Sequence, residues 1–130
     1  MQRANSSFVI DKKDAAVVDW DGGNMGHNSF YKTFSGDITG TSLVKAIMLM
    51  SEAPGPAVYV GIERFNCTVL GKTGTFLMTH SAVMQGGVQS AQWTIVPGSG
   101  TGELTGIRGR GDILPKHDFV LEYEFAEAVM

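Results

Sequence analysis

Loops rich in glycine and proline recur along this chain and divide it into short segments of β-branched and aromatic residues. The loops read DGGNMG, SGDITG, EAPGP, GKTG, QGG and PGSGTG. Such punctuation is typical of antiparallel strands joined by turns, as in a meander or barrel. We therefore expect an all-β fold. The predicted strands are residues 8–10, 15–20, 29–34, 41–50, 57–70, 75–84, 88–96, 102–107 and 119–125.

Residues 41–50 are the ambiguous segment, because TSLVKAIMLM also fits a helix that begins after a cap at Ser42. No composition shift or linker interrupts the chain, and its length suits one hydrophobic core. The sequence thus predicts a single domain over residues 1–130, with residues 41–50 as either strand or helix.

The glycine-rich run VPGSGTGELTGIRGRGD, residues 96–112, resembles a phosphate-binding loop only superficially. A P-loop ending in the GKT of residues 71–73 would need a glycine where Asn66 stands, and a dinucleotide fingerprint starting at Gly100 would need one at Thr105. We therefore predict that the run binds no nucleotide. Its glycines are expected to serve bends, bulges and close backbone approaches.

Charge and cysteine content exclude several classes of partner and site. The formal net charge is −3, with a pI near 5.5, so the chain has no broad basic field for nucleic acid or anionic lipid. No apolar stretch approaches the length of a membrane span, and the single cysteine, Cys67, forms no internal disulfide. The N-terminus shows no leader pattern. We expect a cytoplasmic protein without a nucleic-acid or membrane partner.

The segment YVGIERFNCTVLGKTGTFLMTHSAVM predicts a hairpin that gathers the most unusual side chains of the chain. With Lys72 and Thr73 at its tip, Phe65 would face His80, and Glu63 would be the diagonal neighbour of His80. One face of this hairpin would carry Tyr59, Glu63, Phe65, Cys67, Phe76, Met78, His80 and Met84. A carboxylate and an imidazole would then meet in a mostly apolar wall.

Glu63 and His80 are the candidate catalytic residues, as an acid–base pair. A buried carboxylate must find a partner or take up a proton, and either state supports proton transfer. The structural alternative is that Glu63 faces solvent or pairs with Arg64 or Arg108, while His80 is an ordinary core histidine. The histidines show no metal-ligand spacing, so we predict neither a metal nor a cofactor.

Five blocks of sequence resemble a family of small, mostly bacterial proteins known as domain of unknown function 3224. The blocks are FSGDITG, YVGIERF, GKTGTFLMTHSAVMQGG, WTIVPGSGTGELTGIRGRG and FVLEYEF. The resemblance implies a closed antiparallel β-barrel of about eight strands, similar to that of allene oxide cyclase, and favours a strand at residues 41–50. It also implies an apolar lumen, self-association and roles for Glu63, His80 and Glu103, but no activity.

Three hypotheses on function follow. The chain could bind a small apolar molecule in the barrel lumen, act there as an isomerase or cyclase through Glu63 and His80, or be a structural homo-oligomer with a filled lumen. The first is preferred, and whether the protein is an enzyme stays open. Its predicted ligand-binding residues are Tyr59, Phe65, Cys67, Phe76, Met78, Met84 and Glu103.

Apolar residues on the opposite face of the hairpin predict a covering partner. These residues are Val60, Ile62, Leu77 and Val83. Because a closed barrel has no free edges, the cover would be the N-terminal segment, the tail AEAVM or another copy packed face to face. The resemblance favours another copy, so we expect a homodimer or larger assembly.

Overall fold

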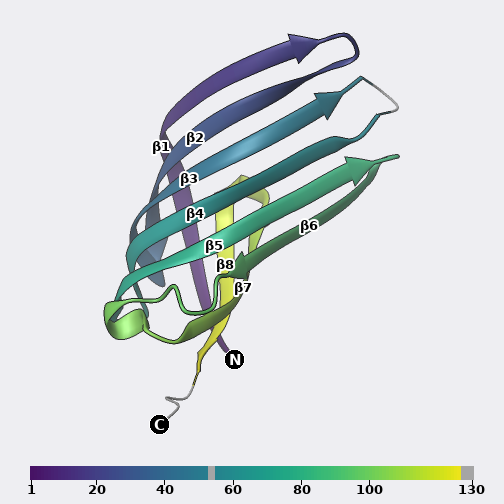
Figure 1. Ribbon diagram of the computed structural model, residues 1–130. Coiled ribbons are helices and arrows are strands. Elements are labelled where there is room, and N and C mark those ends of the chain that lie inside the picture. Colours follow the sequence, from purple (N-terminus) through teal and green to yellow (C-terminus); the bar gives the residue numbers. More distant parts are fainter. Residues whose placement is uncertain (53–54, 127–130) are drawn as a thin grey trace.

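The computed structural model describes residues 1–52 and 55–126, which form one closed antiparallel β-barrel of eight strands (Figure 1). The strands follow one another around the wall in sequence order, and pairing of the last with the first closes it. The all-β class, the closure and the strand number are therefore confirmed. The strands are β1 (Gln2–Trp20), β2 (Gly23–Gly36), β3 (Ile38–Ser51), β4 (Ala57–Val69), β5 (Lys72–Gln85), β6 (Val88–Ile95), β7 (Ile107–Leu114) and β8 (Asp118–Phe125).

Two of the predicted strand boundaries are wrong, while residues 41–50 are confirmed as strand within β3. Residues 8–10 and 15–20 belong to one strand, β1, because the polar run between them keeps its pairing with β2 apart from a bulge at Asp11. Of the predicted strand at residues 102–107, only Ile107 lies in a strand, as the first residue of β7. A short 3₁₀ turn, η1 (Gly102–Leu104), comes first, and Gly106 then turns the chain with φ +86° before β7 begins.

The hairpin between β4 and β5 turns at Leu70 and Gly71, not at Lys72 and Thr73. Both turn residues have positive φ, 45° and 85°, which suits a two-residue hairpin loop. The predicted register is therefore wrong by four positions, and Phe65 pairs with Phe76 instead of His80. An even shift keeps every side chain on its predicted face, because strand side chains alternate with period two.

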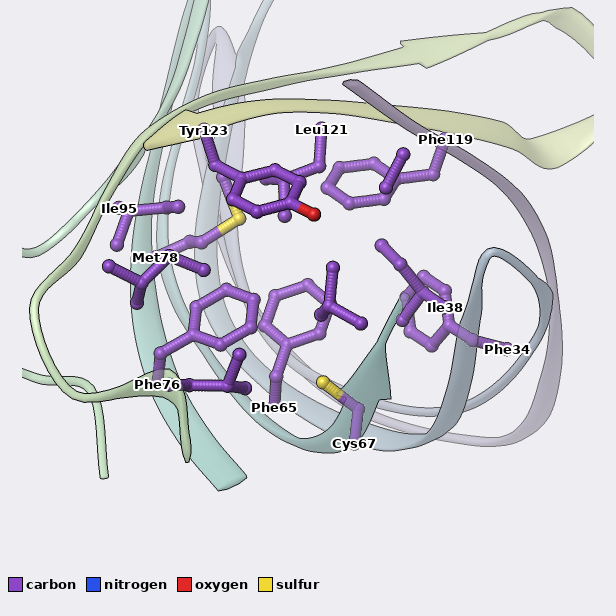
Figure 2. Packing of buried hydrophobic residues seen from close by; sticks show 14 of the residues in the cluster. Phe34, Ile38, Phe65, Cys67, Phe76, Met78, Ile95, Phe119, Leu121 and Tyr123 are labelled. Carbon is purple, nitrogen blue, oxygen red and sulfur yellow. The ribbon is translucent and has the colours of Figure 1, made fainter. Parts of the chain in front are cut away.

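One end of the barrel is filled by a dense aromatic core (Figure 2). The rings of Phe65 and Phe76 stack with centroids 4.6 Å apart, and Phe34 and Phe119 pack beside Phe65. Leu104, in η1, is fully buried against the same cluster. The lumen at this end is therefore occupied by the protein's own side chains.

At the other end, strands β1 to β6 extend beyond β7 and β8 (Figure 1). Strand β1 pairs with β8 only through residues 2–7, and β6 pairs with β7 only through Trp93 and Thr94. Residues 12–20 of β1 and 88–92 of β6 therefore pair on one side only within the described residues. The expectation that barrel closure leaves no free edge is wrong, because the wall closes over only part of the length of its longest strands.

The expected cover over the outer face of the hairpin does not come from the N-terminal segment, which forms the barrel wall as β1. Val60, Ile62 and Val83 remain 46%, 55% and 42% exposed. Of the tail AEAVM, residues 127–130 lie outside the described residues.

The glycine-rich run bends the chain and lets segments approach closely, as predicted. Gly98, Gly102 and Gly109 have positive φ. Gly100 lies so close to the carbonyl of Leu104 that an added Cβ would overlap it, and a Cβ at Gly111 would lie 2.7 Å from the Phe119 ring. That the run binds no nucleotide stays a prediction.

Candidate functional site

Glu63 and His80 meet inside the barrel, as the sequence predicts. Met78 on β5 pairs with Glu63 on β4, and His80 lies two residues after Met78. Glu63 and His80 are therefore diagonal neighbours on adjacent strands. The Oε1 atom of Glu63 lies 2.8 Å from Nε2 of His80, although the ring N–H is not well aligned for a hydrogen bond. Their side chains are 1% and 2% exposed. The alternative in which Glu63 faces solvent or pairs with an arginine is excluded.

Lys32 and Ser42 complete the cluster, and sequence reasoning missed both. The Ser42 hydroxyl donates a hydrogen bond of 2.5 Å to Oε2 of Glu63, and Nζ of Lys32 lies 3.4 Å from the same oxygen. Lys32 also stands 4.2 Å above the centroid of the Phe8 ring. The alternation of Phe30, Lys32 and Phe34 along one strand was the available signal, because it places a lysine on the aromatic face.

Electrostatics keep Glu63 ionised. Burial acts to raise the pKa of Glu63, but contact with His80, the charge of Lys32 and the hydroxyl of Ser42 outweigh burial and hold the pKa below its ordinary value. The sequence left open whether Glu63 is paired or protonated, and the contacts favour the paired carboxylate. Glu63 is therefore an anion at neutral pH, suited to balance a positive charge, while its lowered pKa makes it a weak base.

Two neighbouring groups have pKa values shifted the other way. Burial, and then the charge of Glu63, raise the pKa of Tyr59 to about 12, so its hydroxyl stays protonated and able to donate. The same causes raise the pKa of Cys67 to about 12. Cys67 is therefore a neutral, buried thiol and a poor nucleophile at neutral pH.

The remaining predicted ligand-binding residues divide between three places. Phe65, Cys67, Phe76 and Met78 lie in the packed core. Glu103 lies exposed on η1, where its carboxylate accepts a hydrogen bond from the backbone N–H of Thr73. Tyr59 and Met84 line a hollow further along β4 and β5. The structure thus brings only Tyr59 and Met84 of this set together in a hollow.

The hollow has a volume of about 170 Å³ and lies where β4 and β5 extend past the packed core. Met48, Tyr59 and Ala82 lie side by side across it on β3, β4 and β5. The next row towards the core is Ala46, Gly61 and His80. The ring of Tyr59 lies 6.2 Å from that of His80. Tyr59 thus connects the hollow to the Glu63–His80 pair, although neither member of the pair lines it.

In residues 1–52 and 55–126, no group of three or more His, Cys, Asp or Glu side chains is arranged to hold a metal ion. No helix in the same ranges is long and apolar enough to cross a membrane.

Together, the fold and the cluster define a small antiparallel β-barrel that buries an ionised carboxylate where its packed core ends. The chain belongs to the family described as protein of unknown function (DUF3224), whose model matches residues 4–126. A solved DUF3224 structure of unknown function from Shewanella oneidensis MR-1 is 27% identical, with a TM-score of 0.86, over 98% of this chain and 99% of that chain. Among curated proteins, none matches. The likeness to allene oxide cyclase stays a prediction.

Proposed function

We propose that the protein binds a small, mostly apolar molecule in the hollow beside Tyr59 and Met84. The observation that carries this proposal is an apolar hollow whose lining residue Tyr59 lies 6.2 Å, ring to ring, from His80, the partner of the buried Glu63. Apolar walls with a few convergent polar groups are typical of small-molecule sites. A cavity of about 150 Å³ accommodates a benzene ring, so a hollow of this size suits one ring or a short branched chain.

This site differs in position from the lumen expected from the sequence. The core end of the lumen is filled by residues such as Phe65 and Phe76, each no more than 1% exposed. A ligand there would have to displace packed rings at a cost of several kcal/mol. The ligand contacts are therefore Tyr59 and Met84, with the Tyr59 hydroxyl as a hydrogen-bond donor.

Filling the hollow is expected to abolish ligand binding. Ala82→Trp places an indole between Tyr59 and Met84, whereas Ser81→Trp places the same side chain on the opposite, exposed face of β5. Titration calorimetry with acetophenone, a one-ring apolar probe with a single hydrogen-bond acceptor, should show saturable binding by the wild type and by Ser81→Trp, and none by Ala82→Trp. Equal binding by the two variants, or no saturable binding by the wild type, would reject the proposal.

A second candidate function is isomerisation of the bound molecule through Glu63 and His80. The observation in its favour is the distance of 2.8 Å between a carboxylate oxygen and an imidazole nitrogen, which is within the reach required of an acid–base pair. An isomerase only relocates a proton and bonding electrons within one molecule, so it needs no co-reactant.

The assay for this second function is conversion of small lipophilic epoxides. Activity is expected to fall by at least about a hundredfold in His80→Gln, because general acid–base groups commonly contribute that much. The Thr79→Gln variant, on the outer face of the same strand, is the control. If the wild type binds the probe but converts none of the epoxides, binding would remain the proposed function and the isomerase hypothesis would be rejected.

A further inference from the structure

We propose that two copies of this chain pair along the free edge of β1, antiparallel to each other, about a two-fold axis at Ala16. The edge consists of residues 12–20, which pair with β2 on one side and with no strand on the other within the described residues. An open strand edge carries backbone N–H and C=O groups that can pair with another chain. The partner that fits this edge is a second copy.

The edge is regular over the whole stretch that would pair. The bulge at Asp11 precedes it and the turn at Asp21 and Gly22 follows it, while the register with β2 is continuous from Lys12 to Trp20. The side chains are already exposed, including Val17 at 57% and Val18 at 68%. Pairing would remove apolar surface from water without disturbing the core.

The order of charged residues along the β1 edge selects the register between the two copies. Lys13, Ala15, Val17 and Asp19 lie on the inner face, since the register places Lys13 in one row with Glu63 and Ala15 in one row with His80. When Ala16 faces its own copy, Lys13 faces Asp19 of the second copy, and Asp19 faces its Lys13. The edge thus forms two symmetry-related ion pairs with itself, which a two-fold interface requires.

Neighbouring registers lose this complementarity. Shifting the axis to Ala15 leaves Lys13 opposite Val17, and shifting it to Val17 leaves Asp19 opposite Ala15. Neither register forms an ion pair within residues 12–20. Shifting the axis to Asp14 places two aspartates opposite each other, which is destabilising across strands. On the outer face of the chosen register, Lys12 faces Trp20, a pairing that permits a cation–π contact.

The free edge of β6 does not offer the same match. Residues 88–92 read VQSAQ, a shorter stretch without a charged side chain to specify a register. The second copy therefore pairs with β1, and strands β1 to β6 of each barrel join into one continuous sheet.

Charge reversal tests this interface with a built-in rescue. Asp19→Lys should raise the dimer dissociation constant at least about tenfold, because both ion pairs become like-charge contacts. The double variant Lys13→Asp with Asp19→Lys restores opposite charges and should restore the dimer. Asp112→Lys, a charge reversal at an exposed position on β7, should leave the dimer dissociation constant unchanged. Light scattering across micromolar concentrations distinguishes a mass of 13.9 kDa from twice that value.

A cysteine pair tests the register directly. Ala16→Cys places two thiols opposite each other at the axis, so oxidation should give a disulfide-linked dimer. Asp14→Cys, on the same strand and the same face, leaves its two thiols four strand positions out of register and should not cross-link. Cys67, 4% exposed, stays out of the reaction.

Three results would overturn the proposal. The first is that the wild type keeps a mass of 13.9 kDa at every concentration. The second is that the Asp19→Lys variant still forms the dimer. The third is that Asp14→Cys cross-links as readily as Ala16→Cys. The second result would place a dimer interface elsewhere, for instance on the exposed outer face around Val60 and Ile62.

Discussion

Replacing Glu63 by glutamine is expected to lower the free energy of unfolding by about 3 kcal/mol, because removing one partner of a buried ion pair leaves the other charge uncompensated. Lys32, whose side chain is 7% exposed, would keep a charge without a counterion in contact with the Phe8 ring. Urea unfolding at pH 7 measures the change. A loss below about 1 kcal/mol would show that the cluster is hydrated enough to dispense with Glu63.

A double variant separates the charge effect from a simple loss of packing. Removing both charges with Lys32→Met and Glu63→Gln should recover part of the lost stability, since replacing a buried ion pair by uncharged groups is often close to neutral. Glu124→Gln is the matched control, because its partner Arg108 is half exposed. That change should cost no more than about 0.5 kcal/mol.

The pH dependence of stability follows from the direction of the pKa shift of Glu63. Because the folded state holds this pKa below the ordinary value of 4.5, the unfolded state takes up the proton first as the pH falls. The stabilisation is therefore complete above pH 4.5 and is lost as the pH falls through the lower folded value. The wild type should lose more stability than Glu63→Gln between about pH 5 and about pH 3.

Gly100→Ala is expected to cost about 3 kcal/mol, at the upper end of what overpacking costs. A Cβ at this position would overlap the backbone carbonyl of Leu104 and lie 3.0 Å from Cγ2 of Ile107. Both residues are fully buried, and backbone cannot move aside as a flexible side chain can. The loop would have to lift η1 and withdraw Leu104 from the core.

The control for Gly100→Ala lies in the same loop. Gly98 has φ +84° and no atom within 4 Å of its added Cβ, so Gly98→Asn introduces a residue that tolerates positive φ into open space. Its expected cost is under about 1 kcal/mol. Thermal unfolding of the two variants makes the comparison, and equal losses would mean that the glycines provide flexibility instead of close packing.

The face of each residue in the hairpin could be predicted from sequence because strand side chains alternate. This alternation placed Glu63 and His80 together even though the register was wrong by four positions, since the shift exchanged one diagonal neighbour for the other. The register itself depended on which residues turn. Leu70 adopts φ 45°, a conformation that residue type rarely takes, so GKTG was the more obvious turn.

The extent of the strands and the location of the hollow could not be predicted, for a different reason. The run DKKD resembles a loop by composition, yet it continues β1 because β2 pairs with it and both its faces meet solvent. The hollow exists because β7 and β8 end early while β4 and β5 continue. Relative strand length is a property of the tertiary structure, and local residue patterns do not encode it.

Closure of the wall between β1 and β8 also dictates when this protein can finish folding. The Ser6 hydroxyl donates a hydrogen bond to the backbone carbonyl of Phe119, 113 residues later in the chain. During synthesis, the hairpins from β1 to β6 can form as they emerge, but the first strand has no closing neighbour until the last strand has been made. A nascent chain therefore carries an open, curled sheet until β8 has been synthesised.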